Sequence, residues 1–271
     1  MNAQVANRAR SSLAQSFVAG AGSISQSVLL LGSGDSDALS INDLEAAIVI
    51  DPELSLRTLA LANSAFYSQQ HEISALRSAV VVLGADAVHN LAASMLARSL
   101  HSSPSVIDES LWQHCQVVAV AGQMLAETHG QIGPNQAFAA GLLHDIGILA
   151  IRNADGSDGE YLIEHAAVGA EIVDLLGLSP SLSEAIKNHD AAHSFNFAEA
   201  PLEATVSLAN HLAERCGYAY FGESVSGEDL VCSLVANFKL KDSDIDALAD
   251  GLYARLEKLQ GMSGDQNGNS T

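Results

Sequence analysis

The stretch AFAAGLLHDIGILAI, from Ala137 to Ile151, is apolar on every side except at His144 and Asp145. An apolar stretch of this length without alternating polar residues predicts a helix buried in the protein core. An ionised Asp145 in such a helix is costly unless a cation or several hydrogen-bond donors compensate its charge. The sequence therefore predicts that other parts of the chain bring a partner to Asp145.

Three further histidines lie on the apolar stripes of predicted helices. His114 follows Leu111 by three residues, and His165 follows Leu162 by three residues, so each falls on the apolar face of its helix. His189 falls on the apolar face of the helix that begins at residue 180. A single histidine on such a stripe is more often a hydrogen-bonded core residue than a ligand. The stripes of neighbouring helices meet in a shared core, however, and this predicts one buried cluster. Its expected members are His114, His144, Asp145, His165 and His189.

Two explanations fit a buried cluster of this composition. Imidazole and carboxylate groups suit a divalent transition metal such as Fe, Mn, Zn, Co or Ni better than Ca or Mg. A bound metal is the more economical explanation, because it compensates all of these groups at once. The alternative is a network without metal, in which Asp145 accepts protons from His114, His165 or His189. The residues alone leave both explanations open.

The positions of the prolines predict an all-α fold. Each proline stands just ahead of a segment with 3.6-residue apolar periodicity, where proline is tolerated as the first helical residue. The five are Pro52, Pro104, Pro134, Pro180 and Pro201. The one β-branched run, Ala79 to Leu83, closes with Gly84 and fits either a short strand or a buried helical turn.

The composition argues against several classes of protein. Lys and Arg total 12 against 32 Asp and Glu, and a net charge of −20 repels phosphate backbones, so direct nucleic-acid binding is not expected. No run approaches the roughly 20 apolar residues of a membrane span. The stretch after Arg8 and Arg10 is too polar for a secretory signal, which predicts a cytoplasmic protein. Cys115, Cys216 and Cys232 are widely spaced and fit reduced thiols.

Three stretches together carry a family resemblance. They are Asp51-Pro52-Glu53-Leu54 through Leu61-Ala62-Asn63-Ser64-Ala65-Phe66-Tyr67, then Ile73 through Ala79-Val80 and Leu83-Gly84, and finally Gly141-Leu142-Leu143-His144-Asp145-Ile146-Gly147. With these stretches the chain resembles the HDOD family, the HD-related output domains of bacterial signalling proteins. That family is related to the HD superfamily of metal-dependent phosphohydrolases.

The resemblance implies the organisation of the chain. The resemblance covers residues 23–216, which are expected to form the HDOD domain, and a lead helix is expected before it at residues 1–22. That domain has an N-terminal helical half at 23–107 and an HD-like half at 108–216. Beyond the resemblance, a C-terminal helical extension is expected at 217–260. The composition of residues 261–271, rich in Gly, Ser and Asn, predicts a disordered tail.

Carried over position by position, the resemblance makes His114, His144, Asp145, His165 and His189 metal ligands. Two departures from the superfamily pattern concern this site. Asp190 stands where the cyclic-dinucleotide phosphodiesterase branch has a second histidine, and the Gly-Tyr-Pro signature of that branch is missing after His189. Asn210 stands where the last carboxylate of the HD site is expected, and an amide is a poorer bridging ligand. Asp190 and Asn210 are therefore candidate additional ligands.

Two functions remain open at this point. The first is a signalling output module, weakly catalytic or not catalytic, that acts on a signalling protein partner or a small phosphorylated ligand. The second is a metal-dependent phosphohydrolase acting on a phosphoester or nucleotide, with Asp145 as its catalytic residue. A phosphohydrolase also needs cations for substrate phosphates, and the HD-like half offers only Arg152, Lys187 and Arg215.

Overall fold

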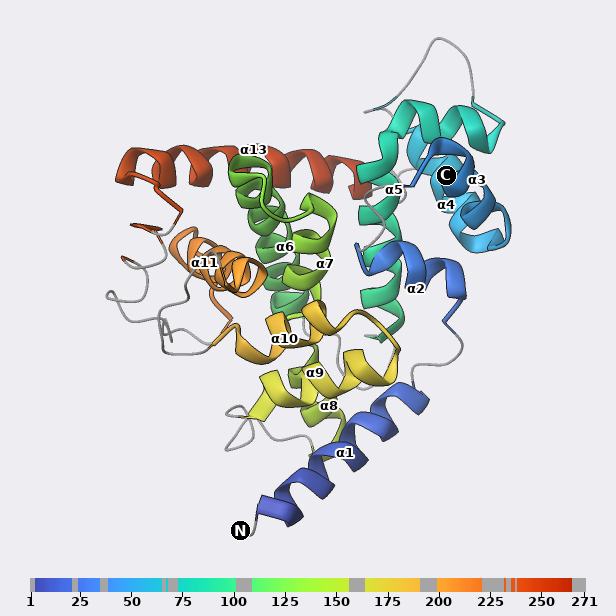
Figure 1. Cartoon of the computed structure of the whole chain (residues 1–271). Helices are drawn as coiled ribbons and strands as arrows, with labels where there is room; N and C mark the ends of the chain where they lie inside the picture. Colours follow the sequence, from blue (N-terminus) through green and yellow to red (C-terminus); the bar gives the residue numbers. More distant parts are fainter. Residues whose placement is uncertain are drawn as a thin grey trace.

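The chain folds into helices connected by turns and loops (Figure 1). The computed structural model describes residues 3–20, 24–34, 39–64, 67, 73–100, 109–155, 164–190, 199–220, 232, 235–236 and 238–264. The helices are α1 (Ala3–Gly20), α2 (Gln26–Gly32), α3 (Ile41–Val49), α4 (Pro52–Ala62), α5 (Leu76–Leu100), α6 (Glu109–His129), α7 (Pro134–Leu143), α8 (Ile146–Asp155), α9 (His165–Leu175), α10 (Pro180–Asn188), α11 (Pro201–Arg215) and α13 (Asp242–Gly264). No strand occurs within these ranges, and the predicted all-α class is confirmed.

The helices form two groups around α5 and α6. Helices α2, α3 and α4 pack against α5, while α7, α11 and α13 pack against α6. Helix α1 lies along α8 and α9, and α13 crosses α6 at the opposite side of the molecule (Figure 1). The HD-like half is therefore covered by one helix from each end of the chain.

Local sequence signals set several helix starts. Pro52, Pro134, Pro180 and Pro201 each occupy the first turn of a helix, as predicted, and Pro104 lies outside the described residues. The Asp51 carboxylate accepts the Leu54 N–H at 2.9 Å and caps α4. The same carboxylate also accepts a hydrogen bond from the Ser25 hydroxyl at the start of α2, so one buried side chain joins two helices.

Helix α5 contains the β-branched run whose structure the sequence left open. Ala79 to Leu83 are helical, and the helix kinks at Gly84, which has a φ of 79°. Among the residues that the structure describes, this is the one helix that by length and composition could cross a membrane, since its most apolar window has a mean hydropathy of 1.5. Half of that window is buried inside the protein, which is equally typical of a core helix.

The buried stretch from residue 137 to 151 is two helices, which corrects the expected single helix. Helix α7 ends at Leu143 and α8 begins at Ile146. The His144 ring contacts the Gly141 carbonyl at 2.8 Å through Nδ1, so it competes with the backbone N–H that this carbonyl would accept in a continuous helix. The chain therefore turns at His144 and Asp145.

Two glycines let helices approach closely on either side of this turn. A Cβ on Gly141 would lie 2.8 Å from the backbone of Ala119 in α6. A Cβ on Gly147 would lie 2.0 Å from the carbonyl oxygen of His165 in α9. Both distances are shorter than real Cβ contacts, so the crossings of α7 with α6 and of α8 with α9 require glycine.

The C-terminal helix extends further than the composition predicts. Helix α13 continues to Gly264, past the boundary at residue 260 that was expected for the start of a disordered tail. Gly and Ser lower helix propensity without forbidding a helix, which is why composition misplaces such an end. Residues 265–271 lie outside the described part of the chain.

Candidate metal centre

Five residues predicted from the sequence converge at the turn between α7 and α8. His144 and Asp145 form this turn, His114 lies inside α6, His165 is the first residue of α9, and His189 caps the C-terminus of α10. All five are buried, with at most 7% of any residue exposed. Residues up to 75 positions apart, from 114 to 189, therefore share one site, as the apolar stripes predict.

The Asp145 carboxylate lies between two pairs of histidines. On one side, Asp145 Oδ2 is 3.2 Å from His144 Nε2 and 3.6 Å from His114 Nε2. On the other side, Asp145 Oδ1 is 3.2 Å from His165 Nε2 and 3.4 Å from His189 Nε2. The side chains thus form two groups of three potential metal ligands that share one carboxylate.

Backbone carbonyls determine which ring nitrogen of three histidines carries the proton. His114 Nδ1 lies 2.7 Å from the Tyr218 carbonyl oxygen, and His144 Nδ1 contacts the Gly141 carbonyl. His189 Nδ1 lies 2.6 Å from the carbonyl of Ile186, three residues earlier in α10. Because a carbonyl only accepts hydrogen bonds, Nδ1 donates in each ring and Nε2 keeps its lone pair when the ring is neutral. These lone pairs are directed into the cluster.

The facing lone pairs provide a test of whether a metal fits. His114 Nε2 and His144 Nε2 are only 3.2 Å apart, and so are His165 Nε2 and His189 Nε2. Two lone pairs at this distance repel each other unless a proton or a metal cation lies between them. Imidazole nitrogens held by carbonyls and grouped around a carboxylate are the donor set of transition-metal sites. The residues therefore suit a divalent metal.

Without a metal, protons have to supply the positive charge. Burial alone would raise the pKa of Asp145, but the charge and hydrogen bonds of His144, His165 and His189 hold it well below its usual range. Burial alone would lower the pKa of His165, but Asp145 and Asp190 raise it to about 11. Burial, together with the neighbouring His144, lowers the pKa of His114. Burial alone would lower the pKa of His144, but Asp145 raises it. In the metal-free network the positive charge thus lies on His165 and His144, while His114 is neutral.

Asp190 joins the cluster because α10 ends before it. Adjacent positions on a continuous helix diverge by about 100°, so His189 and Asp190 reach one site only where the helix stops. Helix α10 ends at Asn188. Asp190 Oδ2 lies 3.1 Å from His165 Nε2, and Asp190 Oδ1 lies 3.3 Å from His189 Nε2. With 29% of its side chain exposed, Asp190 connects the buried cluster to solvent.

Asn210 lies on α11 next to the cluster helices and is 91% buried. Its Oδ1 atom has no hydrogen-bond partner among the described residues. Ser207, one turn earlier on α11, donates its hydroxyl to the His189 carbonyl at 2.7 Å, so this face of α11 lies against the end of α10. The role of Asn210 as an additional metal ligand stays a prediction.

The sequence did not predict the Tyr218 carbonyl, which orients His114 from beyond the expected domain boundary at residue 216. Every residue has a backbone carbonyl, so the sequence does not single out the one at Tyr218. The glycine at 217, which follows an apolar stripe, does indicate that a helix ends there.

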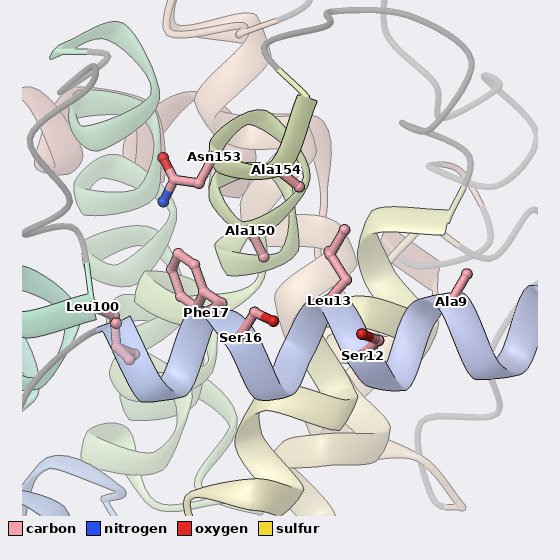
Figure 2. A pocket seen from close by; sticks show the side chains of 10 residues that line it. Ala9, Ser12, Leu13, Ser16, Phe17, Leu100, Ala150, Asn153 and Ala154 are labelled. Carbon is pink, nitrogen blue, oxygen red and sulfur yellow. The ribbon is translucent and has the colours of Figure 1, made fainter.

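The described residues also form a cavity of about 560 Å³ away from the cluster. Figure 2 shows it between α1 and α8, with Phe17 and Leu13 on one side and Ala150 and Asn153 on the other. None of its lining residues belongs to the His/Asp cluster.

Comparison with protein families identifies two overlapping domains. The HDOD domain matches residues 23–162, which is about half of the chain, and the HD domain matches residues 111–237. The five cluster residues and Asp190 all lie within the HD match, and so do Asn210 and Tyr218. No curated protein matches the chain.

Solved structures share the fold at low sequence identity. An HDOD domain protein of unknown function from Geobacter sulfurreducens is 20% identical with a TM-score of 0.67, covering 94% of this chain and 97% of its own. A protein from Shewanella amazonensis, provisionally described as a phosphohydrolase, is 23% identical with a TM-score of 0.62, covering 92% and 95%. A protein from Marinobacter aquaeolei, provisionally described as a signal transduction protein, is 21% identical with a TM-score of 0.65, and the match covers 88% of this chain and 58% of that one.

Proposed function

The chain belongs to the HDOD domain family, and from this premise we propose that it is a bacterial signalling output domain whose buried cluster binds a divalent transition metal without efficient catalysis. The proposal includes a cytoplasmic location and, as partner, a signalling protein or a small phosphorylated ligand. The proposal does not include direct nucleic-acid binding, because a net charge of −20 repels phosphate backbones.

One observation carries the metal part of the proposal. The lone pairs of His114 and His144 face each other at 3.2 Å, and their Nδ1 atoms are both committed to backbone carbonyls. A cation shared by these rings and by Asp145 relieves the repulsion. Imidazole with carboxylate supports Fe, Mn, Zn, Co or Ni over Ca or Mg as the bound ion. Such a metal supplies Lewis acidity at the site.

The surroundings of the site support a non-catalytic role. A phosphohydrolase needs cations for the phosphates of its substrate. Lys187 Nζ lies 3.3 Å from Glu184, and Arg215 lies 3.8 Å from Asp246. Both basic side chains therefore already form ion pairs with acidic neighbours. Arg152 stacks over the ring of Tyr220. By resemblance, Asn210 also replaces a carboxylate of the HD site.

The test combines metal analysis with an activity assay. Protein purified without chelators is expected to contain one tightly bound transition metal per chain, and Asp145→Ala is expected to contain none. Hydrolysis of a chromogenic phosphodiester with added Mn²⁺ or Fe²⁺ is expected to stay at the level of the Asp145→Ala variant. A metal-free wild type, after expression in medium supplemented with each metal, would overturn the metal part of the proposal.

A second candidate function is a metal-dependent phosphohydrolase of the HD superfamily, and Asp190 favours it. Its carboxylate approaches His165 and His189 and is partly exposed, so it adds a second acidic group where a substrate could enter. The two groups of ligands sharing Asp145 also suit a pair of ions. Two metals per chain, with turnover that both Asp145→Ala and Asp190→Asn abolish, would favour this candidate over the first.

A further inference from the structure

The turn after α11 holds the carbonyl that orients His114. Gly217 has a φ of 85°, a left-handed conformation that suits glycine. The Gly217 N–H bonds to the Glu214 carbonyl and the Tyr218 N–H bonds to the Ala213 carbonyl, each at 3.0 Å. These two bonds are the pattern that ends many helices with glycine. The pattern fixes the direction in which Tyr218 presents its own carbonyl to His114.

The C-terminal helix supports this turn from outside. The Tyr253 hydroxyl of α13 donates to the Cys216 carbonyl at 2.9 Å. Leu252 and Leu256 on the same helix are buried, and Arg255 pairs with Glu127 on α6, the helix that carries His114. Helix α13 is thus seated on α6 and contacts the end of α11 through Tyr253 (Figure 1).

We propose that Tyr253 is a positioning residue of the metal centre: by holding the turn at 216–218, it keeps the Tyr218 carbonyl on His114 Nδ1. This inference rests on the proposed metal function and names a residue that controls the same site. Tyr253 lies outside both family matches, which end at residues 162 and 237.

The hydroxyl of Tyr253, more than its ring, carries this role. The residue is 44% exposed, so its ring contributes less packing than the buried leucines beside it. A carbonyl on Nδ1 fixes the tautomer that leaves the Nε2 lone pair for the metal and raises the basicity of the ring. When the turn loosens, His114 can place its proton on Nε2 instead, and the cluster loses one ligand.

The first experiment compares two variants of α13 with Co²⁺ as the probe. Tyr253→Phe removes one hydroxyl, and it is expected to weaken Co²⁺ binding about 3- to 10-fold in chelator competition, somewhat less than the 10- to 100-fold typical of a direct partner of a ligand. The visible absorption of bound Co²⁺ is expected to change with it. Arg255→Gln is the matched control, because it removes an exposed ion pair of α13 and leaves the Tyr253 hydroxyl in place, and its Co²⁺ affinity and spectrum are expected to match the wild type.

The second experiment changes the turn itself and uses the metal-free protein. Gly217→Ala has open space around its Cβ but a strained backbone, whereas Gly217→Asn tolerates the left-handed conformation. In ¹⁵N-histidine spectra, the Nδ1–H proton of His114 is expected to exchange faster in Tyr253→Phe and Gly217→Ala than in the wild type. Gly217→Asn is expected to restore slow exchange. Melting temperatures of the metal-free variants report separately on folding.

The outcomes separate this inference from the proposed function. A wild type that binds Co²⁺ with the same affinity as Tyr253→Phe would overturn the positioning role alone. A wild type that binds no Co²⁺ would overturn the metal function, and the exchange of the His114 Nδ1–H would then decide whether Tyr253 positions the ring. Unchanged exchange in both Tyr253→Phe and Gly217→Ala would overturn the inference.

Discussion

His114 Nε2 and His144 Nε2 face each other at 3.2 Å, while a backbone carbonyl holds the Nδ1 atom of each ring. Neither ring can turn its lone pair away without giving up its hydrogen bond to the carbonyl. A proton or a metal cation between the two nitrogens therefore stabilises the site, and the contribution that a metal makes can be measured.

Metal removal is expected to destabilise the wild type and to leave Asp145→Asn unaffected. A ligand at 100 times its dissociation constant stabilises a protein by about 2.7 kcal/mol. For a chain of this size, that corresponds to roughly 5–10 °C in melting temperature. Calorimetry with and without a strong chelator measures the difference. An equal chelator effect on the two proteins would show that the metal stabilises the fold from another site.

Asn210→Asp is expected to have opposite effects with and without metal. In the metal-free protein the new carboxylate is buried without a partner, which should lower the free energy of unfolding by about 3–5 kcal/mol. In the loaded protein it offers a charged ligand, and metal affinity should rise about 10-fold or more. Asn42→Asp is the control, because it adds the same charge at an exposed position beside Arg77 and should leave metal affinity unchanged. A stabilised metal-free Asn210→Asp protein would contradict the prediction.

Gly147→Ala is expected to destabilise the fold and the site together. The new Cβ would meet the His165 carbonyl, a backbone atom that cannot move cheaply, so α8 and α9 must separate. Overpacking of this kind costs about 1–3 kcal/mol, occasionally more. Metal affinity should fall as well, because His165 begins α9. Gly20→Ala, with nothing within 4 Å of its Cβ, should change stability by less than about 1 kcal/mol.

Asp51→Ala is expected to lower stability by about 1–2 kcal/mol near neutral pH through loss of the α4 cap. Burial alone would raise the pKa of Asp51, but hydrogen bonds from the Leu54 N–H and the Ser25 hydroxyl lower it below 3.8. The contribution of Asp51 to stability is therefore fully present above the unfolded-state pKa of 3.8. It is lost as the pH falls through the lower pKa that Asp51 has in the folded protein. Urea titrations across this range should show the two proteins converging in acid. A difference that stays constant down to pH 2 would contradict the role of the charged form.

The sequence predicted which residues meet, because periodicity alone places His114, His165 and His189 on inward faces. It did not predict the turn at His144, since the competition between the His144 ring and the backbone for the Gly141 carbonyl leaves no periodic signal. The position of Asp190 depended in the same way on where α10 ends. Local side-chain bonds to the backbone, which set such ends, are the part of the site that apolar patterning cannot show.

The two glycines beside the turn also constrain the segment between them. Gly141 fixes the crossing of α7 on α6, Gly147 fixes the crossing of α8 on α9, and His144 lies three residues from each. One inserted or deleted residue between these glycines would move one of them out of its crossing and bring a side chain into a contact that has no room for a Cβ. The two crossings therefore fix the length of the seven-residue segment from Gly141 to Gly147 that carries His144 and Asp145.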